Sequence, residues 1–372
     1  MHEVDVVIIG AGAVGLACAA TLASRGDAVL VVERNARCGQ ETSSRNSGVI
    51  HAGLYYPPGS LKAQLCVEGR ELLYARAART GVPYRKLGKL VVASDAGESA
   101  RLEQLMAVAQ ANGAGATRIL EGDEARAIEP RLHVTLALWS PETGIVDAHA
   151  LMDSYRQQAQ QHAADLLLYA GVVAIDHRAT GYELTLEVGP DRERERVRAQ
   201  RVVNAAGLSA PRVAKLAGLD VDALGYRQYL CKGDYFSVRR SATQGLAHLI
   251  YPLPVQAGLG VHLTLDLEGQ VRAGPDTTYV EHESYAVDEN KRAAFAAAIR
   301  RYFPHVREED LAPDYAGMRP KLQGPGQAFR DFVIEDSAAH GLPGFVQLIG
   351  IESPGLTASE AIAGRVAKLL PR

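Results

Sequence analysis

Residues 43–63 read SSRNSGVIHAGLYYPPGSLKA and hold several side chains that can do chemistry. Small residues such as Ser43 and Gly48 let a backbone lie close against a flat group, while His51 and Lys62 can move a proton or bind an anion. The segment has neither a helical apolar stripe nor a sustained strand alternation. Its residue types therefore predict a loop that lies against a ligand and carries reactive groups to it.

The N-terminal residues carry the parts of a dinucleotide-binding unit in order. A buried-strand pattern at residues 5–9 leads into Gly10, Gly12 and Gly15, and a helix-like run follows. Gly10 permits a tight turn, Gly12 lets the backbone approach a pyrophosphate, and Gly15 lets the helix pack closely on the strand. The N–H groups at the start of this helix point toward the phosphate charge.

An acidic residue ends the second strand of this unit. Residues 28–32 read AVLVV and are followed by Glu33. The Glu33 carboxylate can accept hydrogen bonds from a ribose diol and repels a 2′-phosphate, so the unit is not suited to NADP. No second G-x-G-x-x-G occurs in strand–helix context, which argues against a flavin reductase or monooxygenase that also docks NADPH.

A further part of the same domain is predicted far along the chain. Residues 201–207 read RVVNAAG, an apolar strand that ends in Asn204 and small residues. Such a strand end can pass beneath a bound cofactor without side-chain obstruction. The first domain is therefore expected to be interrupted and then resumed.

Composition sets broad limits. The chain has 372 residues, 47% of them hydrophobic, which suits a globular protein of about two domains, and its net charge of −3 favours neither nucleic acid nor anionic lipid. No long uninterrupted apolar window occurs, and the apolar N-terminus lacks a preceding basic segment, so we expect no membrane span and no signal peptide.

The four cysteines have no zinc-like spacing, so we expect free thiols, no metal site and a cytoplasmic location. The charge run DRERERVR at 191–198 is expected to be a solvated hairpin rim.

Several motifs together resemble the D-amino-acid-oxidase-like superfamily of FAD enzymes. They are the glycine turn, Glu33, the 43–63 segment, GIVD at 144–147, NAAG at 204–207 and AGMRPKL at 316–322. Within that superfamily, NSGVIHAGLYYPPGSLKAQLC, GKLVVA at 88–93, HLIYPLP at 248–254 and GVHLT at 260–264 look like L-2-hydroxyglutarate dehydrogenases/oxidases. The chain departs from that pattern around 285–305, where it is shorter, and at 350–357, where GIESPGLT replaces an Asn-Ala-Pro-Ser-Pro-Ala-like loop.

The resemblance implies an α/β two-domain (α+β) fold that binds FAD. A Rossmann-like FAD-binding domain is expected over residues 1–85, 145–215 and 315–372. A discontinuous, largely antiparallel-sheet substrate domain is expected over 86–144 and 216–314, where it would cover the flavin. Strand-like runs at 88–93, 229–238, 248–254 and 258–266 agree with this division.

The resemblance also implies roles for residues near the flavin. His51 is expected on its reactive side, as the base that takes the hydroxyl proton while a hydride passes from a CH–OH carbon to flavin N5; a histidine that only packs against the flavin and a covalent histidyl–flavin link are the alternatives. Arg319, which lies between Met318 and Pro320, is expected to bind the substrate carboxylate through its planar fork, with a surface arginine after a turn as the alternative. The residues expected to contact the cofactor are Gly10, Gly12, Ala13, Val14, Gly15, Glu33, Arg34, Thr42, Ser43, Ser44, Asn46, Ser47, Gly48, Val49, His51, Val173, Ala205, Ala206, Gly207, Arg319, Gly350, Ser353, Pro354, Gly355, Leu356 and Thr357.

A second substrate carboxylate would require a further cation or several hydroxyl donors. Because Lys232 follows Cys231 in a strand-like run, its charge is expected either at the rim or lining the site. The candidates for this role are Lys62, Lys232, Tyr55, Tyr56, Tyr251 and His262.

The expected function is FAD-dependent oxidation of the CH–OH of an anionic 2-hydroxy acid, L-2-hydroxyglutarate or a near analogue, to the 2-oxo acid. Oxygen, a quinone or a redox protein would take the electrons. An amino-acid oxidase of the same fold, acting on CH–NH, is the nearest alternative. An NAD-dependent dehydrogenase and a flavin-binding assembly or RNA-modification factor are further alternatives, although no basic RNA-binding stripe is evident.

Overall fold

The computed structural model describes residues 2–254 and 260–371 and begins with the predicted glycine-turn unit. This unit consists of β1 (His2–Ile9), α1 (Ala13–Ser24) and β2 (Val29–Val32), and the two strands pair in parallel. Gly10 has φ +106°, and a Cβ on it would meet the Ala205 carbonyl oxygen at 2.6 Å. A Cβ on Gly15 would meet the Gly10 carbonyl oxygen at 2.0 Å, so both positions require glycine.

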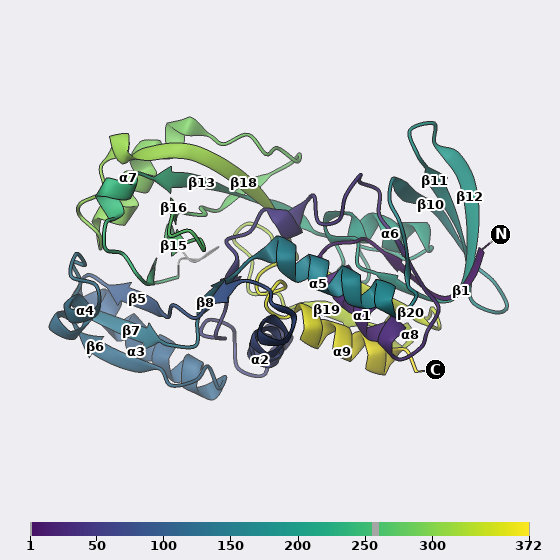
Figure 1. Cartoon of the computed structure of the whole chain (residues 1–372), viewed down its shortest axis with the longest axis horizontal. Helices are drawn as coiled ribbons and strands as arrows, with labels where there is room; N and C mark the ends of the chain where they lie inside the picture. The colour runs from purple at the N-terminus through teal and green to yellow at the C-terminus, as the bar shows by residue number, and fades with distance from the viewer. Residues whose placement is uncertain (1, 255–259, 372) are drawn as a thin grey trace.

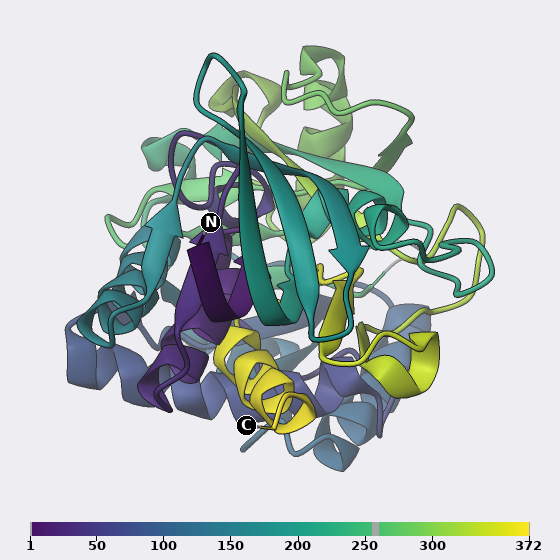
Figure 2. The same ribbon diagram turned by 90° about the vertical axis from the view of Figure 1, so that its right-hand side faces the viewer.

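The glycine-turn unit lies at the centre of an eight-stranded sheet with the order β10–β11–β12–β1–β2–β9. β12 (Glu193–Asn204) runs parallel to β1 and places Asn204 opposite Ile9, so the RVVNAAG segment lies directly beside the first strand. β10, β11 and β12 form the long ribbon at the right of Figure 1, which faces the viewer in Figure 2. The other strands of this sheet are β9 (Asp165–Leu167), β10 (Ala170–His177), β11 (Tyr182–Val188), β19 (Val333–Glu335) and β20 (Phe345–Ile349).

Helices cover one face of this sheet. α1 packs against α5 (Ala148–Gln161) and α9 (Ser359–Leu369), and α2 (Leu61–Thr80) packs against α9. Leucine, isoleucine and alanine side chains of α1, α5 and α9 share one buried cluster. Local signals set the ends of α2, because Ser60 accepts a hydrogen bond from the Ala63 N–H and Gly81 ends the helix in the left-handed conformation.

A nine-stranded sheet forms the other half of the molecule, at the left of Figure 1. Its order is β17–β13–β16–β15–β14–β5–β7–β6, with β18 on the other edge of β13. Its pairings are antiparallel except for β14 with β5, which agrees with the expected largely antiparallel sheet. Its strands are β5 (Lys89–Ala93), β6 (Arg118–Glu121), β7 (Leu136–Ser140), β13 (Tyr229–Val238), β14 (Leu249–Pro252), β15 (Leu263–Leu265), β16 (Val271–Ala273), β17 (Thr278–Val280) and β18 (Leu311–Lys321).

A small sheet joins the two halves. It consists of β3 (Val49–Ile50), β8 (Gly144–Val146) and β4 (Tyr84–Arg85), and β3 leads directly into His51. The remaining elements are α3 (Ala96–Ala111), α4 (Gly122–Ile128), α6 (Ala210–Leu216), α7 (Arg292–Arg300), α8 (Ser337–His340) and short 3-10 turns at 42–44, 207–209, 240–243, 289–291 and 308–310.

The two large sheets are built from different parts of the chain. The eight-stranded sheet uses only residues of the expected FAD-binding ranges, but β18 continues across the boundary expected between residues 314 and 315. Val221 and Tyr226 also lie in the expected substrate domain, yet they pack with Ile349 in a separate buried cluster. The exact boundaries therefore stay a prediction.

The charge run 191–198 forms the end of the turn between β11 and β12 and the first part of β12, and its charged residues are exposed, as predicted, while Val197 is buried. Of the strand-like run 258–266, the structure assigns β15, while residues 258 and 259 lie outside the described residues. Within the described ranges no helix is long and apolar enough to cross a bilayer, and the four cysteines are free thiols.

Candidate active site

Two adjoining cavities of about 330 and 390 Å³ lie between the glycine turn, the 42–51 segment and β18. They share Val14, Thr42, Ser43 and Ile351 in their walls, so they meet along the first turn of α1. The larger cavity extends toward Glu33 and is called here the nucleotide cavity. The smaller extends toward His51 and Arg319 and is called the reaction cavity.

The nucleotide cavity fits a dinucleotide. α1 begins after Gly12 with no side-chain cap and no acidic residue in its first turn, which leaves its positive end suited to a phosphate. A Cβ on Gly12 would meet the Ser43 hydroxyl at 2.9 Å, so only glycine leaves this approach open. Glu33 is held in place because its carboxylate accepts hydrogen bonds from the N–H groups of Ala11 and Asn35, each at 2.8 Å.

Most residues expected at the cofactor lie in the walls of these cavities. In the nucleotide cavity the structure places Gly10, Gly12, Val14, Glu33, Arg34, Thr42, Ser43, Val173, Ala205, Ala206 and Gly207. In the reaction cavity it places Ala13, Val14, Thr42, Ser43, Asn46, Ser47, Val49, His51, Arg319, Ser353, Pro354, Gly355, Leu356 and Thr357.

Four expected contacts lie behind the walls instead. Gly15 packs on the Gly10 carbonyl, and the Ser44 hydroxyl donates to the Glu41 carbonyl oxygen. Gly48 donates its N–H to the Asn46 side chain, and Gly350 lies against Leu322. The three glycines shape the walls through their backbone, because a close approach leaves no room for a side chain at these positions, and Ser44 uses its hydroxyl in the turn after Glu41.

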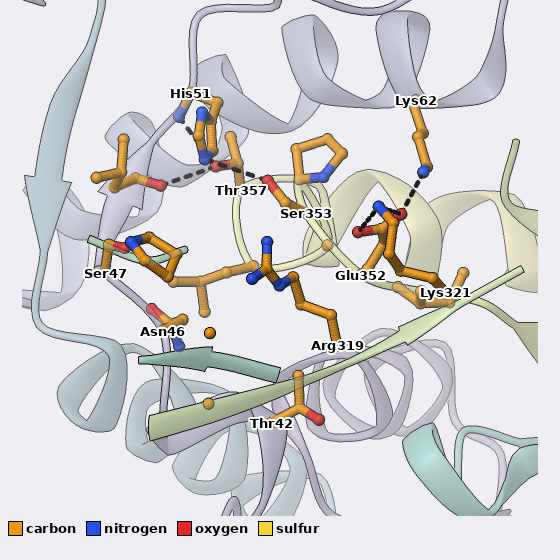
Figure 3. A pocket seen from close by; sticks show the side chains of 18 of the residues that line it. Thr42, Asn46, Ser47, His51, Lys62, Arg319, Lys321, Glu352, Ser353 and Thr357 are labelled. Atoms are coloured by element: carbon orange, nitrogen blue, oxygen red, sulfur yellow. Dashed lines mark hydrogen bonds and ion pairs between the residues drawn. The ribbon is translucent and has the colours of Figure 1, made fainter. Parts of the chain in front are cut away.

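His51 lies at one side of the reaction cavity, where the residues that follow β3 meet the loop after β20. Its backbone N–H donates to the Thr357 hydroxyl at 3.0 Å, and its Nε2 lies 3.3 Å from the Ser353 hydroxyl (Figure 3). Burial, followed by the charges of Lys89 and His262, lowers the pKa of His51 to about 3. The imidazole is therefore neutral at neutral pH and able to accept a proton.

Arg319 reaches the same cavity from β18. The 42–48 segment lies against this strand, since the Thr42 hydroxyl donates to the Met318 carbonyl oxygen at 3.0 Å and a Cβ on Gly317 would meet the Arg45 carbonyl oxygen at 2.3 Å. In Figure 3 the Arg319 guanidinium points into the space between His51 and Lys321. It donates to the backbone carbonyls of Lys232 and Asp276, and within residues 2–254 and 260–371 it forms no ion pair with a carboxylate. Its charge is therefore available to an anionic ligand.

The aromatic candidates also lie in the reaction cavity. The Tyr251 ring stacks on the His262 imidazole at 3.7 Å between centroids, and the Tyr56 hydroxyl lies 3.4 Å from that of Ser353. Burial lowers the pKa of His262 to about 3, which leaves this ring neutral as well. Tyr55 and Lys62 line the same cavity.

Lys232 is not among the residues that line either cavity, which corrects the expectation that it could line the site. Gly233 and Tyr235 line the reaction cavity, and because side chains alternate along a strand, Lys232 points to the opposite face of β13. Its ammonium pairs with Asp234 at 3.0 Å and also donates to the Ala286 carbonyl oxygen.

Sequence reasoning missed several residues at the site, among them Tyr235, Lys321, Glu352 and Lys89. Tyr235 lines the cavity and bonds the Ser47 hydroxyl at 2.8 Å, and Lys321 and Glu352 line the wall beyond Arg319. Lys89 is fully buried behind the rings of Tyr55 and Tyr251. Lys321 had a usable signal, because a residue two positions after Arg319 in a strand shares its face; the other three had none.

Comparisons with known proteins agree with this geometry. The family model DAO, described as FAD dependent oxidoreductase, matches residues 5–369. The chain belongs to this family. It is therefore an FAD-dependent oxidoreductase, and the expected fold class and cofactor are confirmed.

Curated relatives include two proteins named L-2-hydroxyglutarate dehydrogenase, mitochondrial. The one from Arabidopsis thaliana is 40% identical over 98% of this chain and 83% of its own length. The one from Homo sapiens is 30% identical over 98% of this chain and 88% of its own length.

Similar solved structures share the whole fold. L-alpha-glycerophosphate oxidase from Mycoplasma pneumoniae, with FAD bound, has a TM-score of 0.89 at 26% identity and covers 100% of this chain and 95% of its own. Glycine oxidase from Geobacillus kaustophilus has a TM-score of 0.82 at 22% identity, with the same coverage, and this likeness concerns the fold alone.

Proposed function

We propose that this protein oxidises the CH–OH group of an anionic 2-hydroxy acid, L-2-hydroxyglutarate or a near analogue, to the 2-oxo acid. The observation that carries the proposal is one cavity that combines a neutral imidazole, that of His51, with an arginine, Arg319, that has no carboxylate partner among the described residues. The printed names of the curated relatives support the choice of substrate.

The residues divide the chemistry between binding and proton movement. Arg319 binds the carboxylate next to the reacting carbon through two parallel charge-assisted hydrogen bonds. Nε2 of His51 accepts the hydroxyl proton, and the hydroxyls of Ser353 and Tyr56 continue the polar path from that atom. FAD, held by the glycine turn and the 42–49 segment, supplies the hydride acceptor when bound.

The electron acceptor and the compartment are also proposals. A single G-x-G-x-x-G unit favours an electron acceptor other than a nicotinamide dinucleotide, and oxygen, a quinone or a redox protein each fits. The four free cysteines support a reducing compartment such as the cytoplasm. Steady-state turnover with oxygen, with a soluble quinone and with neither would distinguish the acceptors.

The substrate proposal is tested by anaerobic stopped-flow reduction of the bound flavin. L-2-hydroxyglutarate is expected to reduce it faster than any member of a panel of amino acids. A faster reduction by an amino acid would overturn the proposal in favour of CH–NH oxidation on the same fold.

Arg319→Lys tests the carboxylate anchor. Lysine keeps the charge but loses the planar fork, so KM for the hydroxy acid is expected to rise by at least about 10-fold. Lys215→Arg, on the surface helix α6, is a control that changes the same residue types outside both cavities. An unchanged KM in Arg319→Lys would show that the anchor lies elsewhere.

A further inference from the structure

Beyond Arg319, the wall of the reaction cavity carries a buried cluster of three charged residues. Lys62 lies in the first turn of α2, Lys321 ends β18, and Glu352 lies in the loop after β20. Glu352 Oε1 accepts from Lys62 Nζ and from Lys321 Nζ, each at 2.9 Å. Figure 3 shows the three side chains together at the right of the pocket, on the other side of Arg319 from His51.

The cluster has more positive charge than its own carboxylate can neutralise. The side chains of Lys62, Glu352 and Lys321 are only 6%, 7% and 10% exposed. Burial raises the pKa of Glu352, but the charges and hydrogen bonds of the two lysines lower it by more, so the pKa lies below its ordinary value and the carboxylate stays ionised. Two buried ammonium groups therefore share one hydrogen-bonded carboxylate, whereas the Asp331 carboxylate accepts from the backbone N–H groups of Leu61 and Lys62. A further anion placed close to the two ammonium groups is therefore stabilised.

The lysines also have hydrogen-bond donors to spare. An ammonium group has three N–H donors, whereas Lys62 Nζ makes one hydrogen bond to Glu352 and otherwise lies 5.3 Å from the ring centroids of Phe329 and Phe332. Lys321 Nζ uses two donors on the two oxygens of Glu352. Both side chains line the cavity, so their remaining donors can serve a ligand.

The spacing between Arg319 and Lys321 matches a short dicarboxylate. The two residues are two positions apart in β18, so their side chains leave the same face of the strand roughly 6–7 Å apart. This spacing is close to the separation of the two carboxylates at the ends of a five-carbon chain. Because all three side chains line the same cavity, a substrate held by its first carboxylate on Arg319 can direct its second toward Lys321 and Lys62.

We propose that Lys62 and Lys321 bind the distal carboxylate of a dicarboxylic 2-hydroxy acid, with Glu352 as the internal counter-ion that holds both lysines in place. This inference rests on the proposed function and adds its specificity: a five-carbon dicarboxylate is selected over a monocarboxylate of the same length. Of the two lysines that the sequence offered for a second carboxylate, Lys62 lines the cavity and Lys232 does not.

Arg45 is the other cation in the cavity wall and provides the competing explanation. Its guanidinium lies 4.2 Å from the ring centroid of Tyr285, and its carbonyl lies against Gly317. It therefore approaches β18 on the side of Arg319 away from Lys321. Only one of these two sides can hold the distal carboxylate.

The experiment measures ligand binding to the FAD-bound holoenzyme through the change in flavin absorption. The probes are glutarate and pentanoate, which differ only in the distal carboxylate and are not oxidised at a hydroxyl. In Lys321→Met and in Lys62→Met, Kd for glutarate is expected to rise about 10- to 100-fold, while Kd for pentanoate changes less than about 3-fold. Arg45→Met is expected to leave the preference for glutarate intact.

Arg76→Met is the matched control. Arg76 lies on the same helix as Lys62, is 3% exposed and pairs with Glu360 at 2.7 Å, but it lines neither cavity. Its loss removes a buried ion pair without touching the reaction cavity, so both Kd values are expected to stay unchanged.

Glu352→Gln keeps the inference testable if a lysine variant fails to fold. The substitution keeps an oxygen at position 352 that can still accept from both lysines but removes its negative charge, so glutarate is expected to bind about 3- to 10-fold more tightly while pentanoate is unaffected. Weaker glutarate binding in this variant would overturn the inference.

Three further results would also overturn it. They are equal weakening of both probes in the lysine variants, release of FAD from those variants, and loss of the glutarate preference in Arg45→Met alone. Because the probes are not substrates, the two proposals fail separately. Selective glutarate binding without oxidation of any 2-hydroxy acid would refute only the proposed function, and oxidation of L-2-hydroxyglutarate without discrimination by the lysines would refute only this inference.

Discussion

Four polar atoms beside the reaction cavity are buried and lack a hydrogen-bond partner in the described part of the chain: Arg45 Nε, His51 Nδ1, the Tyr55 hydroxyl and Lys89 Nζ. Lys89 Nζ lies 4.6 and 4.5 Å from the ring centroids of Tyr55 and Tyr251, which partly replace its lost hydration. Burial lowers the pKa of Lys89 to about 7. At the residue scale the site therefore holds its histidine neutral by combining burial with a nearby cation.

His51→Ala tests the proton acceptor. The variant is expected to slow anaerobic flavin reduction by L-2-hydroxyglutarate by at least about 10-fold, since general-base help is typically worth about 10²–10⁴-fold. His162→Ala, at the exposed end of α5, is the control and should leave the rate unchanged. An unaltered rate in His51→Ala would return His51 to a packing role.

Lys89→Met is expected to stabilise the fold while altering the pH profile. At pH 7 it removes a desolvation cost of roughly 1–3 kcal/mol. The pKa of Lys89 is about 7 in the folded protein and near 10.5 in the unfolded chain. Between these pH values the unfolded wild-type chain binds more protons than the folded protein, so the free energy of unfolding of the wild type rises from pH 7 to 10. Urea unfolding at pH 7 and 9 should show that this rise is smaller in the variant.

The same substitution has a kinetic signature. Loss of the nearby cation should raise the pKa of His51, which moves the acid limb of the kcat/KM profile to higher pH. An unshifted limb with altered stability would mean that Lys89 acts on the fold alone.

At the element scale, one face of α2 organises the C-terminal wall of the site. Lys62, Gly69 and Arg76 recur every seven residues, which is about two helical turns. Lys62 pairs with Glu352, Arg76 pairs with Glu360, and between them Gly69 lies against the backbone at 357 and 358. A single helix therefore positions both the loop after β20 and the start of α9.

Gly69→Ala should destabilise the protein, although alanine normally favours a helix by about 1 kcal/mol over glycine. A Cβ at this position would meet the Thr357 carbonyl oxygen at 2.5 Å and Ala358 Cα at 2.6 Å, so backbone must shift. We expect a loss of roughly 1–3 kcal/mol and a changed flavin spectrum, because Thr357 lines the reaction cavity.

Gly364→Ala is the matched control for this prediction. Gly364 lies in α9 with nothing within 4 Å of an added Cβ, so only helix propensity changes and stability should rise by up to about 1 kcal/mol. Equal effects of the two substitutions in urea unfolding would contradict the close packing of α2.

At the scale of the whole molecule, the reaction cavity draws on both halves of the fold. β18 belongs to the nine-stranded sheet, whereas His51 follows the small sheet and the loop after β20 follows the eight-stranded sheet. His51 and His262 are both buried and neutral in this shared space. Protonating either histidine would place a buried charge where the two halves pack together, which destabilises that packing.

The stability of the whole protein is expected to fall as pH drops from about 6.5 toward 3. The unfolded histidines bind protons with a pKa near 6.5, while the folded pKa values are about 3, so the unfolded state binds more protons across this window. Between pH 6.5 and 5, where most carboxylates stay ionised, His262→Gln should show a shallower loss than wild type in urea unfolding. Parallel slopes would mean that His262 titrates normally in the folded protein.

The sequence by itself determined the parts of the protein that depend on local pattern. The glycine turn, Glu33 and the flanking strands specify one βαβ unit because each acts within about thirty residues. That unit implies a dinucleotide, and the resemblance of the longer motifs to a family of FAD enzymes implies FAD. The 43–51 segment could be recognised because its small residues mark backbone close to a ligand, and Arg319 because its Gly-x-Arg-Pro setting resembles that of the family's carboxylate-binding arginine.

Only the tertiary structure decided which charges meet in the cavity. Lys62 and Glu352 are 290 positions apart, and their contact depends on how α2 lies on the C-terminal segment. Lys232 and Lys321 are both lysines of strands, yet one faces away from the cavity and the other into its wall. Strand register and helix rotation set these outcomes, because they determine which face of each element is turned toward the site, and no local pattern records them.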